Sequence, residues 1–219
     1  METSAQTRER KSEASAELER RRVIIEGVRP EIDYGRFPAK RAIGENVVVE
    51  ADVFADGHDA VSCRVLWRPE SGRTWRAVAM EPIGNDRWRG SFPADRLGRL
   101  LFTIEGWVDA FRTWQRDLRK RVDADDVVEI DFRIGAHILE ETALRAQGQY
   151  RKALELAADR LSGSLSREEK TAIAFDARLT TLVARSPDLT HATTYAKELA
   201  VVIDPVRARF STWYELFPR

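Results

Sequence analysis

Hydrophobic and polar residues alternate, with a period of two, along much of the stretch between residues 45 and 120. This alternation is typical of half-buried strands, because successive side chains point to opposite faces of a sheet. Turn residues such as Gly, Pro, Asn and Asp separate the alternating segments. The pattern predicts six or seven short strands, over residues 22–28, 45–54, 62–68, 74–80, 87–92, 99–109 and 113–119.

Short strands joined by hairpin-scale turns predict an immunoglobulin-like antiparallel β-sandwich. In the segment 45–54 the four small apolar residues Val47, Val49, Ala51 and Val53 share one face. We expect faces of this kind, and the aromatic residues that share them, to be buried between two sheets.

The period changes near residue 125, where apolar residues begin to recur every three or four positions, as in an amphipathic helix. The three apolar stripes are Val127/Ile130/Ile134/Ile138, Tyr150/Leu154/Ala157/Leu161 and Ala172/Phe175/Leu179/Leu182. Ser166 and Glu169 have the spacing of a capping box ahead of the third stripe. A fourth, weaker helix is predicted over residues 191–201. Short helices with short connections predict a small helical bundle.

These patterns predict a multi-domain α+β chain with a boundary near Ala124, because a sandwich and a bundle are different packing problems. Residues 1–20 form a charged tail that we expect to be disordered, since it holds almost no large apolar side chain. Residues 21–124 are assigned to the sandwich and residues 125–206 to the bundle. Residues 207–219 are expected to open a further, larger domain.

The charge balance and the single cysteine restrict the function classes. Lys and Arg number 36, as do Asp and Glu, and the resulting net charge of zero argues against a nucleic-acid binder. Cys63 is the only cysteine, so an intrachain disulfide is impossible, and we expect a small buried hydrophobe in a reducing compartment. No apolar stretch is long enough to predict a membrane span or a secretion signal, so the expected location is cytoplasmic.

The sequence offers few candidates for catalysis or metal binding. The three histidines, His58, His137 and His191, are far apart and have no acidic or cysteine companion at ligand spacing. The acidic pairs 125–126, 140–141 and 168–169 are expected to be solvated, because adjacent side chains on a helix point apart. No phosphate-binding glycine loop or nucleophile elbow is present. We therefore predict no catalytic residue, no metal and no cofactor, and assign no substrate-binding residue.

Two roles are open to the tryptophans that fall in predicted strands, and these are Trp67, Trp75, Trp88, Trp107 and Trp114. Core packing is the interpretation that we favour, because a sandwich of this size needs large apolar side chains. Stacking of an exposed ring on a sugar is the alternative. Trp114, which neighbours Arg112, Gln115 and Arg116, is the tryptophan that we expect to be the most exposed.

Six stretches together carry a resemblance to a known family. They are RVIIEGVRPEID (22–33), GRFPAKR (35–41), EADVFADGHD (50–59), MEPIGNDRW (80–88), TIEGWVD (103–109) and FSTWYELFPR (210–219). No one stretch is specific, but the combination is. From residue 22 to the end, the chain resembles the N-terminal part of the bacterial α-1,4-glucan:maltose-1-phosphate maltosyltransferases, which belong to glycoside hydrolase family 13 of the α-amylase superfamily.

The resemblance implies a whole enzyme that moves maltosyl units from α-maltose 1-phosphate to the non-reducing end of a glucan. It implies a retaining mechanism, with an Asp nucleophile and a Glu acid/base on a (β/α)₈ barrel. It also implies a homodimer formed through the sandwich and the bundle. We expect the barrel to begin near residue 207, so none of the family's catalytic positions maps onto this sequence and the chain alone is expected to be inactive. The alternative is a stand-alone carbohydrate-binding or scaffold module without catalysis.

Overall fold

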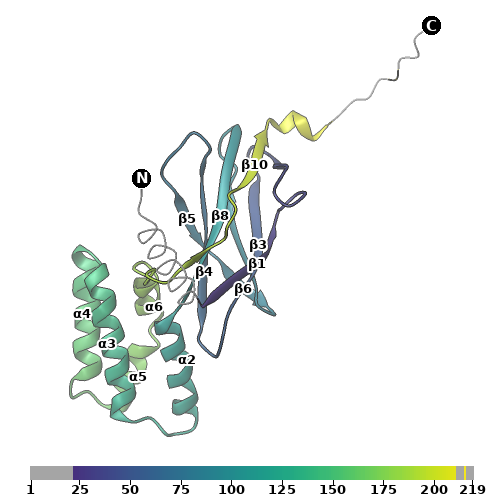
Figure 1. The fold of residues 1–219 in the computed structure, drawn as a ribbon. Helices are drawn as coiled ribbons and strands as arrows, with labels where there is room; N and C mark the ends of the chain where they lie inside the picture. The colour runs from purple at the N-terminus through teal and green to yellow at the C-terminus, as the bar shows by residue number, and fades with distance from the viewer. Residues whose placement is uncertain (1–21, 211–214, 216–219) are drawn as a thin grey trace, which may run out of the picture. The chain divides into compact units, whose positions relative to one another are not determined.

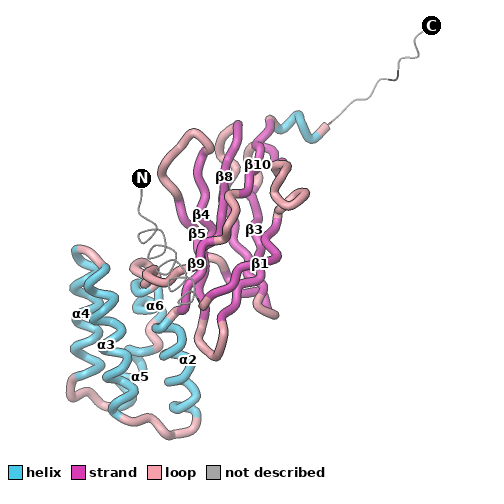
Figure 2. The backbone as a smooth tube through the Cα atoms, viewed as in Figure 1, coloured by secondary structure: helices cyan, strands magenta, loops and turns pink. Residues whose placement is uncertain are grey.

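The structure is a computed structural model that describes residues 22–210 and residue 215 (Figure 1). The predicted tail, residues 1–20, and most of the segment 207–219 lie outside these described residues. The chain divides into two compact units. We call residues 24–54, 63–106 and 193–210 the sheet unit, and residues 22–23, 55–62 and 107–192 the helical unit. The result is an α+β fold, with strands and helices gathered in different units (Figure 2).

The strands form two sheets. Their bounds are β1 (Val23–Arg29), β2 (Ala39–Ala42), β3 (Asn46–Ala55), β4 (Val61–Pro69), β5 (Arg76–Ala79), β6 (Glu81–Gly84), β7 (Arg87–Pro93), β8 (Gly98–Val108), β9 (Thr193–Thr194) and β10 (Leu199–Asp204). One sheet has the order β1-β3-β7-β6, and the other has the order β2-β10-β8-β4-β5, with β9 paired to β8. A short 3₁₀ helix, η1 (Val206–Arg209), follows β10.

The apolar faces of the two sheets meet in the core of the sheet unit. Trp67 on β4 stacks on Phe92 on β7 with ring centroids 5.0 Å apart, and these strands belong to different sheets. The predicted shared face of β3 is confirmed, because its four apolar residues are at most 1% exposed, and they are Val47, Val49, Ala51 and Val53. Burial of such side chains is the main favourable term in folding.

The helix predicted over residues 191–201 is wrong. This segment contains β9 and the beginning of β10 instead. β10 pairs antiparallel with β8 and parallel with β2, so it has a neighbour on each side. The β-branched run Val201-Val202-Ile203 suits a pleated strand better than a helix, and Val201 and Ile203 are buried.

The helical unit contains five α-helices in the described part of the chain. They are α2 (Ala110–Asp123), α3 (Glu129–Arg145), α4 (Gly148–Ser162), α5 (Arg167–Ala174) and α6 (Ala177–Val183). One apolar cluster joins them, drawing Trp114 and Leu118 from α2, Leu139 from α3 and Leu154 from α4. None of these helices combines the length and the apolar character needed to cross a membrane.

The strand predicted over residues 113–119 is also wrong, because this segment lies inside α2. The Asp109 carboxylate caps the helix by accepting a hydrogen bond from the Arg112 amide at 2.9 Å, which satisfies one of the free N–H groups at the helix start. Phe111, Trp114 and Leu118 are buried, and their spacing of three and four residues is that of one helix face.

The helical period of α3 was predicted, but the predicted stripe is only partly buried, because Val127 and Ile138 pack against the helical core and the two isoleucines between them do not. Ile130 and Ile134, placed in the predicted core stripe, are 54% and 48% exposed. The side chains that pack inward lie on the opposite face, and they include Phe132, Ala136, Leu139 and Ala143. Two of these residues, Ala136 and Ala143, are small, as is the buried Gly135 beside them.

The third predicted helical stripe is divided between two helices. The capping box is confirmed, since the Glu169 amide donates to the Ser166 hydroxyl at 3.2 Å and the Ser166 amide donates to the Glu169 carboxylate at 2.9 Å. This box starts α5. Phe175 ends that helix, and Asp176 starts α6 by accepting from the Arg178 amide at 2.8 Å.

Trp114 packs directly on the backbone of α3. Its indole N–H donates to the Asp131 carbonyl at 2.7 Å, and its ring lies over Gly135. A Cβ placed on Gly135 would come within 2.1 Å of the Trp114 ring. Only glycine leaves room for the indole here, so this position fixes how α2 packs on α3.

Substitution of Gly135 by Ala should therefore destabilise the protein, although the same change stabilises an ordinary helix interior by about 1 kcal/mol. We expect a loss of about 3 kcal/mol in the free energy of unfolding, because the buried ring must shift. Urea unfolding followed by circular dichroism measures it. Glu141→Ala, at an exposed position of the same helix, is the control and should change stability by less than about 0.5 kcal/mol. A more stable Gly135→Ala variant would contradict the packing.

Candidate functional site

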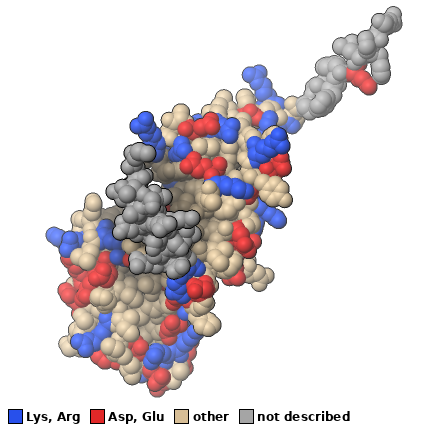
Figure 3. Space-filling model, in the orientation of Figure 1, with Lys and Arg blue, Asp and Glu red and all other residues tan. Residues whose placement is uncertain are grey.

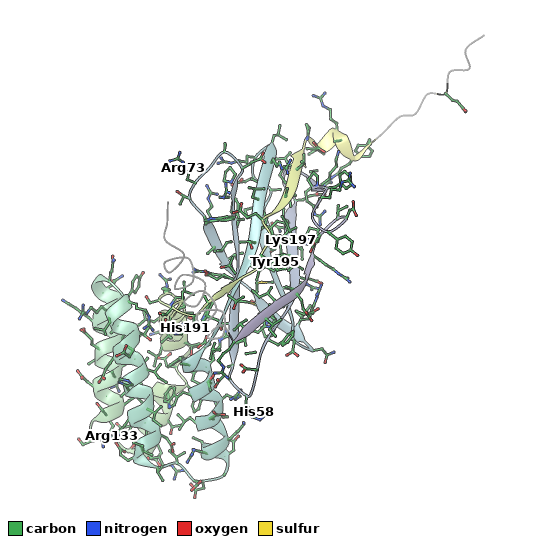
Figure 4. All side chains as sticks on the ribbon, in the orientation of Figure 1. His58, Arg73, Arg133, His191, Tyr195 and Lys197 are labelled. Carbon is green, nitrogen blue, oxygen red and sulfur yellow. The ribbon has the colours of Figure 1, made fainter. Side chains whose placement is uncertain are left out.

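The histidines considered as metal ligands are not gathered into a site. His58 and His191 are exposed, and Figure 4 shows them at separate places in the helical unit. His137 faces Glu140 on the same helix, with the ring nitrogen 3.7 Å from the carboxylate. Within residues 22–210 and residue 215, no three His, Cys, Asp or Glu side chains are arranged to hold a metal ion.

Trp114 is not the exposed aromatic residue that the sequence suggested. It is 7% exposed, because α2 places it inside the helical core. Trp67 and Trp88 are buried as well. Trp75 and Trp107 are half-buried, and the Arg68 guanidinium covers the Trp75 ring at 4.7 Å from its centroid. Core packing therefore accounts for three of the five tryptophans, and the contact with Arg68 accounts for a fourth, Trp75.

The remaining sequence candidates behave as ordinary surface or core groups. The acidic pairs at 125–126, 140–141 and 168–169 are exposed, as predicted. Asp125, for example, forms an ion pair with Arg167 at 2.9 Å. Cys63 is 2% exposed, so it occupies the core position expected for a small hydrophobe.

A hollow of about 710 Å³ lies in the sheet unit between β2, β10 and η1. Its lining is Lys40, Arg41, Ala42, Glu45, Asn46, Asp204, Ala208 and Arg209. Two of its cations are already matched with carboxylates, because Lys40 lies 3.6 Å from Asp204 and Arg209 pairs with Glu45. The third cation, Arg41, donates to the backbone carbonyl of Lys40 at 2.7 Å, so each cation of the lining already has a partner within the protein.

The clearest built feature of the surface is a turn over residues 32–37, which we call the Tyr34 turn. It is closed by hydrogen bonds from the Gly35 and Phe37 amides to the Ile32 carbonyl, at 3.1 and 3.3 Å. Asp33, Tyr34 and Gly35 all have left-handed backbone conformations, with φ of 48°, 56° and 85°. Such conformations cost roughly 1–3 kcal/mol for each non-glycine residue and persist only where the surroundings hold them.

Three side chains, Glu31, Tyr195 and Lys197, hold this turn in place, and we call them the Glu31 latch. The Tyr195 hydroxyl donates to one carboxylate oxygen of Glu31 at 2.8 Å, and the Lys197 ammonium donates to the other. Lys197 also donates to the carbonyl of Tyr34 at 3.1 Å. Figure 4 shows Tyr195 and Lys197 close together in the sheet unit. The latch thus ties the turn to the segment between β9 and β10.

The electrostatics of the latch keep its groups in their ordinary charge states. The hydrogen bond from Lys197 is the main cause that lowers the pKa of Glu31, and the hydroxyl of Tyr195 adds to it. The same hydrogen bond raises the pKa of Lys197. Burial, and then the hydrogen bond to Glu31, raise the pKa of Tyr195. At neutral pH the latch is a carboxylate, an ammonium and a neutral phenol.

The turn presents aromatic surface to solvent. Tyr34 is 87% exposed, the most exposed large hydrophobic residue among the described residues. Phe37 is 51% exposed, and the Arg36 guanidinium lies 5.2 Å from the centroid of its ring. The chemistry of this arrangement is binding, because it offers an aromatic face and charged hydrogen-bonding groups at fixed positions.

The sequence patterns assigned no site to residues 30–38 and missed this feature. The available signal was a tyrosine, Tyr34, placed between Asp33 and the flexible Gly35. Nothing local, however, indicates that Lys197 holds the turn, since it lies 166 residues from Glu31. On the face that Figure 3 shows, cationic and anionic side chains are interspersed, in keeping with the balanced composition.

The fold defines a class: a two-unit α+β module with one unit of two sheets and one unit of five helices in its described part. A family model described as "Alpha-1,4-glucan:maltose-1-phosphate maltosyltransferase, domain N/S" matches residues 21–205. The chain belongs to this family, and the resemblance seen in the sequence is confirmed.

Relatives with this activity in their names match almost the whole chain. The alpha-1,4-glucan:maltose-1-phosphate maltosyltransferase of Chlorobaculum tepidum is 44% identical over 200 residues, which cover 91% of this chain and 30% of the relative. The protein of the same name from Myxococcus xanthus is 43% identical over 205 residues, covering 90% of this chain and 31% of the relative. The chain therefore spans about three tenths of the length of these relatives.

Replacing Glu31 by Gln should lower the free energy of unfolding at neutral pH, because the latch loses its ion pair. A group with a lowered pKa stabilises the fold above its ordinary pKa, and this stabilisation disappears as the pH falls through the lowered value. The difference in the free energy of unfolding between wild type and Glu31→Gln should therefore disappear in acid. It should also disappear in strong base, as Lys197 loses its proton at its raised pKa.

Urea unfolding across the pH range measures this difference. Glu155→Gln is the matched control, because Glu155 pairs with Arg151 at 2.8 Å and is exposed on α4. Exposed helical pairs contribute little, so the control should show a much smaller difference. A Glu31→Gln curve that runs parallel to wild type down to low pH would show that the latch carboxylate is not ionised in the folded protein.

Proposed function

We propose that this chain is the N-terminal accessory and dimer-forming part of a maltosyltransferase. The whole enzyme transfers maltosyl units from α-maltose 1-phosphate to the non-reducing end of α-1,4-glucans and releases phosphate. The match of residues 21–205 to the family is the observation that carries the proposal. The reaction is a retaining double displacement on a (β/α)₈ barrel, and it belongs to the roughly seven tenths of the relatives' length that this chain does not span.

The proposal includes finer statements about architecture and location. The two-sheet unit is an immunoglobulin-like sandwich, supported by strands that meet through aromatic stacking. The helical unit is a bundle, supported by its single apolar cluster. The domain boundary near Ala124 stays a prediction. A cytoplasmic location is supported by the chain's single cysteine, Cys63.

The exposed face of α3 supports a homodimer. Ile130 and Ile134, one turn apart, form an apolar stripe that faces away from the helical core, and Val128, which precedes the helix, is 47% exposed. Exposed apolar side chains gathered at helical spacing are typical of helix contacts between proteins. A second copy of the chain would supply the same stripe, as a two-fold interface requires.

The dimer proposal predicts that charges on this stripe separate the protomers. The double variant Ile130→Asp/Ile134→Asp should raise the dimer dissociation constant by at least about tenfold, because each charge loses water in the interface. Sedimentation equilibrium measures the constant. Leu156→Asp, at a position on α4 that is 60% exposed, is the matched control and should leave it unchanged. A wild-type chain that sediments as a monomer, or a double variant as tight as wild type, would refute this interface.

Exchange of this module into a relative tests the proposed function directly. A chimera of the Chlorobaculum tepidum protein that carries residues 21–205 of this chain should keep phosphate release from α-maltose 1-phosphate within about tenfold of the parent, since matched parts at 44% identity preserve the fold. The 219-residue chain alone should release none above the blank. Deletion of the matching segment from the relative is the control and should abolish activity.

The same experiment separates the proposal from the alternative of a stand-alone carbohydrate-binding or scaffold module. A stand-alone module has no reason to fit the remainder of a relative, so it predicts an inactive chimera. Release by the isolated chain would contradict both readings, because each places the chemistry elsewhere.

A further inference from the structure

Tyr34 is held in an unfavourable conformation that keeps its ring in water. A bulky residue with φ of 56° is an outlier, and its neighbour Asp33 is left-handed as well. The exposed ring, at 87%, recovers little burial energy in return. A turn that folding alone required would be better served by Gly or Asn at this position.

The latch that holds the turn is more elaborate than a loop needs. The Lys197 ammonium donates both to the Glu31 carboxylate and to the Tyr34 carbonyl. Glu31 in turn is oriented by Tyr195, whose backbone amide is anchored on Ile104 at 2.8 Å. Rigid support of this kind positions a binding group and lowers the entropy lost when a ligand is bound.

The charges around Tyr34 indicate a neutral ligand with many hydroxyl groups. Glu31 and Asp33 contribute negative charge, and Arg36 and Lys197 contribute positive charge, so the surface has no net sign. The Arg36 guanidinium is 3.8 Å from the Asp33 carboxylate. Carboxylates accept hydrogen bonds and guanidinium groups donate them, and a sugar ring offers hydroxyl groups for both, as well as an apolar face of C–H bonds for the aromatic ring.

We propose that the Tyr34 turn is an α-glucan-binding site of the sheet unit, in which the ring of Tyr34 stacks on a glucose unit. Arg36 and the neighbouring carboxylate of Asp33 bind hydroxyl groups of the same chain. The choice of an α-glucan as the ligand rests on the proposed function. The site would hold a growing polymer on the sheet unit.

A glucan fits this surface better than a protein partner does. Protein interfaces are built around a contiguous, largely apolar patch with few charges at its centre. Here the exposed aromatic ring is surrounded by charged groups, and the Phe37 ring beside it carries the Arg36 guanidinium. A single exposed ring among hydrogen-bonding groups suits one sugar unit of a flexible polymer.

Affinity electrophoresis of the 219-residue chain in native gels containing glycogen tests the site. The wild-type chain should be retarded as the glycogen concentration rises. Tyr34→Asn removes the ring while keeping a residue that tolerates the left-handed conformation, and it should weaken the apparent affinity by about tenfold. Tyr34→Gly should give the same loss, and Tyr34→Phe, which keeps the ring, should remain within about twofold of wild type.

Tyr150→Asn is the matched control, because Tyr150 lies on α4 and is 39% exposed. It should leave retardation unchanged. A wild-type chain that glycogen does not retard overturns the inference, and so does retardation that survives both ring-removing variants. Sedimentation that changes in Tyr34→Asn without any loss of retardation identifies a protein contact and overturns it as well.

The outcome is separable from that of the proposed function. An active chimera together with a chain that glycogen does not retard rejects the glucan site alone. An inactive chimera together with retardation that depends on Tyr34 rejects the accessory role in the maltosyltransferase and retains the binding site.

Discussion

The sheet unit depends on the insertion of β10 between β2 and β8. Residues 199–203 pair with β8 and residues 201–204 pair with β2, so one late segment joins strands from early and middle parts of the chain. The short strand β2 would otherwise lose its neighbour in the order of that sheet. The residues that lead into β10 also supply Tyr195 and Lys197. The pairing of β10 therefore keeps β2 in the sheet and also fixes the position of the Tyr34 turn.

Sequence patterns located the elements whose burial is decided by neighbours within the same segment. The β3 strand, with one face of Val47, Val49, Ala51 and Val53, was predicted, as was the capping box at Ser166. In both cases the residues that determine the local structure lie within a few positions of one another. Alternation chooses the face of a strand, and a capping box satisfies its own amide groups.

The misplaced elements are those in which tertiary packing outweighed a local pattern. The segment 113–119 was predicted as the last strand of the series, but the Asp109 cap and the fit of Trp114 over Gly135 favour a helix. In α3 two apolar stripes compete, and Ile130 and Ile134 lie outward while the face that holds Phe132 and Leu139 is buried. Periodicity identifies a helix, but it does not identify which of two apolar faces is buried.

The candidate site lay beyond sequence reasoning for a related reason. Its charged residues are separated by 166 positions, and their meeting follows from the pairing of β10, which the sequence misassigned as helix. The position of Lys197 helps to explain the left-handed backbone of Tyr34. The hydrogen bond from the Lys197 ammonium to the Tyr34 carbonyl offsets part of the free energy that this backbone conformation costs. The Glu31 latch thus holds the strained backbone of Tyr34, and that backbone holds the ring of Tyr34 in solvent. A ring buried in the core could be held by packing, whereas a ring kept in water needs a fixed backbone beneath it.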